Sequence, residues 1–248
     1  MAAPQAGRVQ GQAAFVLHTL PYKETSLIVD VLTRDYGRLS LVARGARRPR
    51  AAIRGMMVPF APLALSWFGK NELKTLADAD WVGGVPQLSG VDLLAGFYLN
   101  ELLLKLTGRE DPHPDLFADY SETITHLAFS GRSLAVLLRR FELRLLQHLG
   151  YAPRLACDTE GNALQSELRY VYLRGQGPVR QTHAAGETGC DVSGATLLAL
   201  QGGESEYSVS VQREARLLLS QLLSDCLSGA PLATRELLHA LPGLSVRC

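Results

Sequence analysis

The sequence has few cysteines and none of the close cysteine pairs that bind zinc. The four are Cys157, Cys190, Cys226 and Cys248, and no two have the spacing of a CxxC motif. This predicts no structural zinc and free thiols in a reducing cytoplasm. The first residues lack the apolar stretch of a secretory signal, and no apolar run of 18 residues is present. We therefore expect a cytoplasmic protein without a membrane role.

Catalytic motifs are also missing. The chain contains no phosphate loop of the GxxxxGK type, no GxGxxG, no HExxH and no GxSxG. Its six histidines are scattered, and its acids lack the spacing of a two-metal nuclease. We expect no catalytic residue and no cofactor. An enzyme with an unrecognised site, such as a nuclease, is one alternative.

The formal net charge of +1 hides an asymmetry along the chain. Residues 1–80 contain eleven Lys or Arg and six Asp or Glu, a balance of +5, whereas the remainder has a balance of −4. A basic first third joined to a slightly acidic body is typical of a nucleic-acid-binding module on a scaffold.

The first 80 residues predict short strands separated by turns. The Asp35-Tyr36-Gly37 turn makes the second and third strands a hairpin, and a second hairpin turns at Gly69-Lys70-Asn71. Leu20-Pro21 is expected to close the first strand, and Gly45–Pro62 to form a long basic loop. Five such strands predict an OB-like barrel over residues 1–82. The expected strands are Ala13–His18, Ser26–Thr33, Arg38–Arg44, Leu63–Phe68 and Glu72–Asp78.

The remainder, residues 83–248, predicts an α-helical domain, which makes the whole chain α+β. Apolar residues recur there at spacings of three and four. A Gly-rich stretch at about 151–191 predicts a small inserted subdomain with a hairpin of Arg169–Arg174 and Pro178–Thr182. The expected helices are Asp92–Thr107, Asp115–Phe129, Ser133–Leu149, Ser193–Leu200, Val209–Leu227 and Thr234–Leu241.

The densest cluster of charge lies between Arg34 and Arg54, with seven arginines and one acid. Concentrated guanidinium groups on a folded scaffold favour a partner rich in phosphate, although a solvated basic loop has the same composition. The expected DNA-binding residues are Lys23, Arg34, Tyr36, Arg38, Arg44, Arg47, Arg48, Arg50, Arg54, Lys70 and Lys74.

Aromatic side chains lie among these cations and could stack on bases. Tyr36, at a turn tip, is the strongest candidate, and Tyr22 and Trp67 are others. For Phe60 and Phe68 we expect core packing instead.

A second basic feature is Arg139-Arg140-Phe141-Glu142, on a helix with an apolar stripe. An ordinary amphipathic helix explains this spacing if the arginines are solvated or paired with acids. The functional interpretation is a carboxylate-binding site beside an apolar groove, suited to an acidic peptide.

These segments, taken in order, resemble the RecO family of bacterial DNA repair proteins. The resemblance runs through Phe15–His18, Tyr22–Ser26, Gly37–Arg47 and Glu72–Leu76, and continues in the helical part. The helical matches are Gly96–Leu103, Leu138–Leu143, His148–Tyr151 and Pro231–Leu237. It implies an OB-fold domain followed by a helical domain with an inserted subdomain. Some members carry a four-cysteine zinc site there, a pattern that this sequence lacks.

The resemblance also implies a non-enzymatic recombination mediator. Such proteins bind single- and double-stranded DNA and anneal complementary strands. They help load RecA onto strands coated by the single-stranded DNA-binding protein, SSB, together with RecR and, where present, RecF. They also bind the acidic C-terminal tail of SSB, and in one member an arginine at the position of Arg139 takes part. We expect a tail site of Arg139, Arg140, Leu102, Leu106 and Leu116, and association with the nucleoid. The alternative from another class is an adaptor that scaffolds repair proteins without a direct DNA role.

Overall fold

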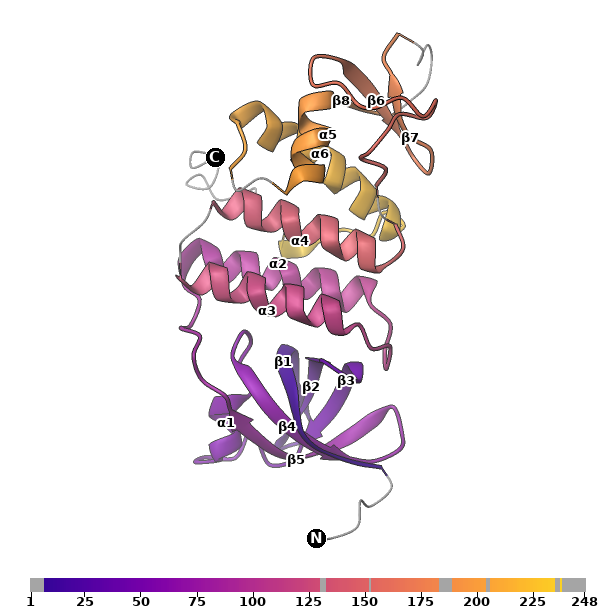
Figure 1. Ribbon diagram of the computed structural model, residues 1–248. Coiled ribbons are helices and arrows are strands. Elements are labelled where there is room, and N and C mark those ends of the chain that lie inside the picture. The colour runs from indigo at the N-terminus through magenta and orange to yellow at the C-terminus, as the bar shows by residue number, and fades with distance from the viewer. Residues whose placement is uncertain are drawn as a thin grey trace. The chain divides into compact units, whose positions relative to one another are not determined.

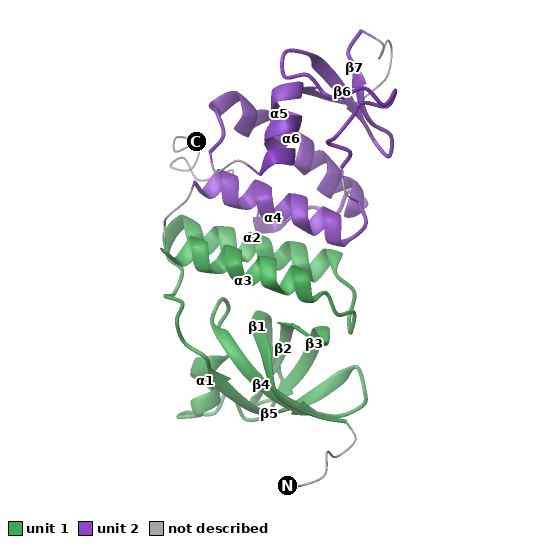
Figure 2. Ribbon diagram, in the orientation of Figure 1, with its two compact units in different colours: residues 1–129 green, residues 130–248 purple. Residues whose placement is uncertain are grey.

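The structure is a computed structural model that describes residues 7–129, 133–151, 153–182, 189–203, 206–234 and 237. It divides into two compact units, residues 1–129 and 130–248 (Figure 2). The barrel strands end at Trp81, near the expected domain boundary at residue 82, and the first compact unit continues to Phe129. The helix predicted for residues 234–241 lies almost wholly outside the described residues.

The first unit contains the predicted five-stranded OB barrel, closed in the order β1-β2-β3-β5-β4 (Figure 1). Neighbouring strands are antiparallel except β3 and β5, which pair in parallel only from Ser40–Leu73 to Val42–Thr75. A short helix, α1 (Ala52–Met56), interrupts the segment expected to be a loop. The strands are β1 (Arg8–Tyr22), β2 (Ser26–Thr33), β3 (Gly37–Ala43), β4 (Pro62–Phe68) and β5 (Leu73–Trp81).

Alternate residues of these strands fill the barrel interior, as period-two patterning requires. Val16, Val31, Leu41 and Leu65 are fully buried there, and Trp67 is the bulkiest of the interior side chains. Burial of such side chains stabilises the folded state by about 1.5–3 kcal/mol each. Because the interior is filled with apolar side chains, side chains that bind a partner must lie on the outer surface or in the loops at the two ends of the barrel.

The first strand is longer than predicted and passes through Pro21. Pro21 is still in register with Leu27 of β2, whereas pairing of β1 with β4 ends at Phe15. Residues beyond Phe15 therefore form an edge on the β4 side, where a missing proline N–H costs no ladder hydrogen bond. The expectation that Leu20-Pro21 ends the strand was wrong for this reason.

Two antiparallel helices, α2 (Gly90–Leu106) and α3 (Pro114–Phe129), cover the outer face of β1 (Figure 1). Phe15 contacts Tyr120 edge-on, with ring centroids 5.2 Å apart. The buried Asn100 donates to the Leu17 carbonyl at 2.9 Å and accepts from Tyr120 at 2.6 Å. Because this amide of α2 bonds to polar groups of both β1 and α3, it fixes the helices against one position along β1.

The connector between α2 and α3 lies against the barrel at the β2–β3 turn. Glu110 N donates to the Arg38 carbonyl at 2.9 Å, and Arg109 forms a parallel backbone bridge with Arg38. A Cβ atom placed on Gly37, whose φ is +66°, would lie 2.1 Å from the Asp111 carbonyl oxygen. Glycine is therefore required at residue 37 for both its φ and its lack of a side chain.

The Gly37→Ala variant should lose several kcal/mol of unfolding free energy, because the new methyl must displace the connector backbone. Gly11→Ala is the matched control, since Gly11 also has a positive φ (+59°) but has open space around it. That control should cost about 1 kcal/mol from backbone conformation alone. Urea denaturation of both variants measures the difference, and equal losses would contradict the tight docking of the connector.

Among its described residues, the second unit contains helices α4, α5 and α6 and a small sheet of order β7-β6-β8. The hairpin predicted in the Gly-rich stretch is confirmed, with Leu173 opposite Gly177 at its turn. No helix in the described part of the chain is long and apolar enough to span a membrane. The elements are α4 (Leu134–His148), β6 (Arg169–Leu173), β7 (Gly177–Arg180), β8 (Cys190–Ser193), α5 (Gly194–Gly202) and α6 (Val209–Cys226).

Candidate nucleic-acid interface

The arginine-rich loop after β3 folds against the β1–β2 turn. Arg47 N donates to the Thr25 carbonyl at 2.8 Å, and Arg47 Nη1 lies 3.4 Å from the Lys23 carbonyl oxygen. A tight turn follows, in which Arg48 N donates to Gly45 O at 3.0 Å. The loop and the turn therefore form one surface at this end of the barrel.

One small residue holds this loop in place while its neighbours face solvent. Ala46 is fully buried in the barrel core beside Met57, whereas Arg44, Arg47 and Arg48 are exposed. A large side chain would not fit where Ala46 packs in a close-packed interior. The sequence Arg-Gly-Ala-Arg-Arg thus anchors the loop through its small residue and leaves its guanidinium groups in water.

Six exposed cations gather on this surface, which we call the basic end. None of the six has a carboxylate within ion-pair distance among the described residues. Unneutralised charge of one sign raises the local potential and attracts polyanions. The basic end consists of Lys23, Arg44, Arg47, Arg48, Arg50 and Arg54.

Two members of the basic end have left-handed backbone conformations. Lys23 has a φ of +51° and Arg50 a φ of +67°, values uncommon outside glycine. The Lys23 ammonium also lies 5.3 Å from the centroid of the Tyr22 ring, within cation–π range. Backbone strain of this kind persists where surrounding structure imposes it, and it concentrates at functional sites.

The other predicted DNA-binding residues lie at the opposite end of β3. Arg34 makes a two-point contact with Asp35, with N–O distances of 3.0 and 3.1 Å. Hydrogen bonds from Arg34 and then Gln12 lower the pKa of the Asp35 carboxyl. Tyr36 is 43% exposed, and its ring packs edge-on against Trp67 at 5.3 Å. Arg34 is thus already paired, while Tyr36 also covers the barrel core.

Lysines of the β4–β5 hairpin differ in accessibility. Lys70 is exposed in the turn, whereas the Lys74 side chain is only 10% exposed and its ammonium donates to the Glu110 carboxylate. Lys74 is opposite the buried Leu41, so it points to the interior side, and its neighbour Leu73 faces outward. Lysine is usually exposed and leucine usually buried, and here the two are exchanged. Burial of Lys74 is possible because its ammonium pairs with the Glu110 carboxylate.

We predicted core packing for both Phe60 and Phe68, and the structure agrees with only one of these predictions. Phe60 is 5% exposed and contacts Phe97, which confirms core packing. Phe68 is 44% exposed, and the expectation of core packing was wrong for it. Trp67 points into the barrel, so alternation along β4 turns the next side chain outward.

Residues expected at the peptide site belong to different units. Leu102 and Leu116 are fully buried in the first unit, and Leu106 is partly buried there. Arg139 and Arg140 lie on α4 in the second unit. Arg139 is 8% exposed and donates to Glu142 at 2.5 Å, whereas Arg140 is half-buried.

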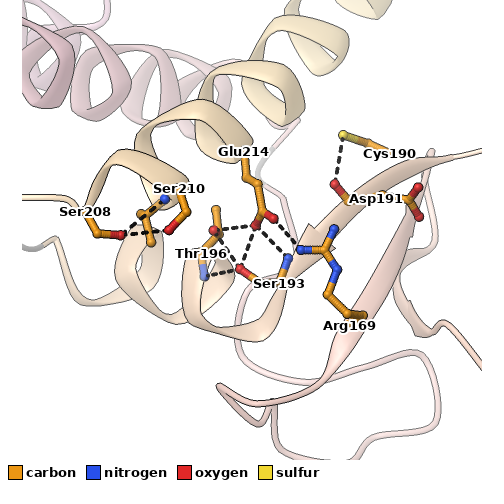
Figure 3. Close-up of polar contacts among 9 residues, drawn as sticks. Arg169, Cys190, Asp191, Ser193, Thr196, Ser208, Ser210 and Glu214 are labelled. Carbon is orange, nitrogen blue, oxygen red and sulfur yellow. Dashed lines mark hydrogen bonds and ion pairs between the residues drawn. The ribbon is translucent and has the colours of Figure 1, made fainter. Parts of the chain in front are cut away.

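A polar cluster around Glu214, which the sequence analysis did not single out, joins helix to sheet in the second unit (Figure 3). Glu214 of α6 accepts from Ser193 N at 2.8 Å, from Ser193 Oγ at 2.6 Å and from Thr196 Oγ1 at 2.7 Å, and it pairs with Arg169 of β6. Burial alone would raise the pKa of Glu214, but these hydrogen bonds outweigh it and lower the pKa to about 2. One ionised carboxylate thus ties together β6, the start of α5 and α6.

The Glu214→Gln variant should lose about 2 kcal/mol of unfolding free energy at neutral pH, since a neutral amide replaces an ionised acceptor. The folded pKa lies below the ordinary value of 4.5, so the stabilisation is complete above that value and disappears as pH falls toward 2. Denaturation across this pH window should show the wild-type and variant curves converging. A constant difference would contradict the role of the ionised carboxylate.

A closed five-stranded barrel followed by helices defines a protein of the OB-fold class, and exposed arginines gather at one end of this barrel. The family model described as recombination protein O N terminal matches residues 9–85, and that described as recombination protein O C terminal matches residues 87–230. The chain therefore belongs to the RecO family of DNA repair proteins.

Named relatives agree with this assignment along nearly the whole chain. The "DNA repair protein RecO" of Laribacter hongkongensis is 51% identical over 242 residues, which cover 97% of this chain and 98% of that protein. The protein of the same name from Chromobacterium violaceum is 49% identical over 245 residues, with 97% and 99% covered. That of Azoarcus sp. is 47% identical over 238 residues, with 94% and 97% covered.

Proposed function

We propose that this protein is a recombination mediator that binds single- and double-stranded DNA and anneals complementary strands. In that role it helps RecA load onto SSB-coated strands, together with RecR and, where present, RecF, at the nucleoid in the cytoplasm. The observation that carries the proposal is the basic end, where six exposed cations surround two joined turns and, among the described residues, none of them forms an ion pair with a carboxylate. It has the charge to hold phosphate and needs no catalytic residue.

Annealing is slow when two strands repel each other, and neutralised phosphates lower that repulsion. A flexible set of guanidinium groups holds the backbone without reading bases, which leaves the bases able to search for register. If each of the six cations contacts one phosphate, the log–log salt slope for a single strand is about −4. Arginine suits this task because its planar fork contacts phosphate at two points.

Replacement of Arg44, Arg47 and Arg48 together with alanine should weaken single-strand binding and flatten the salt slope by about 2, because three phosphate contacts are lost. All three side chains are exposed, so the variant should fold normally. Fluorescence anisotropy of a labelled oligonucleotide at several salt concentrations measures the slope, and strand annealing is followed in parallel.

The matched control replaces Arg154, Arg213 and Arg216, which are exposed in the second unit, and changes the net charge equally. This control should bind and anneal as the wild type does. Unchanged binding in the basic-end variant, or a wild-type affinity that does not depend on salt, would favour an adaptor without a direct DNA role.

We propose in addition that α4 binds the acidic C-terminal tail of SSB through Arg140 and Arg139. Support comes from two adjacent guanidinium groups on one helix and from the resemblance of this segment to the family pattern. Arg139 is buried and donates to Glu142, so it can orient the site, and Arg140 is the less buried of the two and therefore the more accessible to a carboxylate.

The Arg140→Ala variant should weaken binding of an SSB tail peptide about tenfold, since a charge-assisted contact is worth about 1.5–3 kcal/mol, and should leave binding of bare DNA intact. Arg144→Ala, one turn further along α4, is the control. Arg139→Ala is less informative, because removing a partner from buried Glu142 also destabilises the fold. Titration calorimetry with the peptide decides the matter, and equal affinities of wild type and the Arg140 variant would contradict this site.

A further inference from the structure

Two arginines of like charge lie side by side where the α2–α3 connector crosses the barrel. Arg38 of β3 and Arg109 of the connector are direct neighbours in a parallel bridge. Bridged residues of parallel strands project their side chains to the same face. Burial, and then the charge of Arg109, lower the pKa of Arg38. The two guanidinium groups therefore repel each other, and an anion between them would relieve that repulsion.

Carboxylates on the connector and the adjoining strands form no ion pair with these two arginines, although the charge of Asp30 acts on Arg38 and partly opposes the lowering of its pKa. Neither Arg38 nor Arg109 has a carboxylate within ion-pair distance in the described part of the chain. Glu110 pairs with Lys74, Asp111 with His113 and Asp35 with Arg34, whereas Asp30 accepts a hydrogen bond from the Ser40 hydroxyl.

The two arginines differ in accessibility, because Arg109 is exposed whereas Arg38 is partly buried and its Nε is fully covered. Arg109 is exposed and makes no side-chain hydrogen bond among the described residues. Arg38 donates from Nη2 to the Thr107 carbonyl at 2.8 Å, which fixes its guanidinium, while its Nε finds no acceptor. A held guanidinium beside a free one offers a pre-organised contact for phosphate oxygens.

Distance separates this pair from the basic end. Arg38 and Arg44 are six residues apart on and just beyond β3, which corresponds to ~20 Å of extended chain. The Debye length is ~10 Å at 0.1 M salt. The two groups of cations are thus electrostatically independent, and each can act on its own stretch of phosphate.

We propose that Arg38 and Arg109 form a second phosphate-binding site, which holds the complementary strand while the basic end holds the first. This inference rests on the proposed annealing function. It assigns the ligand as the phosphodiester backbone of a second DNA strand and gives Arg109, a residue of the helical connector, a part in annealing. Two sites on one barrel bring two strands together without requiring a second copy of the protein.

The decisive variant is Arg109→Ala, because Arg109 is exposed and Arg38 is needed for its contact with Thr107. Its annealing rate should fall at least ~threefold at 0.2 M salt, while single-strand affinity at the basic end stays within twofold. Arg109→Lys should retain most of the rate, and Arg109→Glu should reduce it further. Arg213→Ala, an exposed arginine on α6, is the charge-matched control and should anneal normally.

The second part of the experiment uses the variant in which Arg44, Arg47 and Arg48 are replaced with alanine. Its residual single-strand binding should weaken further when Arg109→Ala is added, and 10 mM inorganic phosphate should not displace the bound oligonucleotide. If the triple variant loses binding as expected but Arg109→Ala anneals like the wild type, the second site does not exist and the proposed function stands. Displacement of the strand by free phosphate at that concentration would assign the pair to a small anion and overturn its role in annealing.

Discussion

The whole first unit depends on the short parallel pairing that closes the barrel between β3 and β5. Only three residue pairs join these strands, and the connector between α2 and α3 continues the seam where they diverge. Glu110 binds Lys74 of β5 while its backbone bonds to Arg38 of β3, so one residue bridges both sides of the gap. Closure hides the strand edges, which would otherwise pair with other chains. It also fixes the two ends of β3 as separate surfaces.

Separation of those two ends changes how the arginine-rich segment is understood. The sequence suggested one continuous group of cations from Arg34 to Arg54. In the fold, a strand divides the group, and the members before and after it differ in environment. Arg34 is paired and Arg38 is partly buried, whereas Arg44 and its successors are unpaired and exposed. The site that can hold phosphate at high density is therefore the second half, joined by Lys23 from a different turn.

Local patterns predicted most of the fold, and non-local contacts account for the errors. Both barrel hairpins followed from alternation and turn residues, which act over a few positions. The burial of Lys74 could not be predicted, because its partner Glu110 is 36 residues away and belongs to a connector. The sequence also offered no reason to select Arg109 as a binding residue, because its proposed role depends on its position beside Arg38, which is distant in the sequence. In the second unit, Glu214 collects hydrogen bonds from residues about twenty positions away, and no motif marks it.

The central claim is that DNA binds at the basic end of the barrel, and hydrogen exchange with and without a single-stranded oligonucleotide tests it directly. An oligonucleotide of about 16 nucleotides covers the largest sites known for one OB fold. The account predicts that backbone amides of residues 22–26 and 45–54 become protected on binding, because the loop and turn that carry the cations are ordered by phosphate contacts. Protection confined to the second unit, with those two segments unchanged, would contradict it.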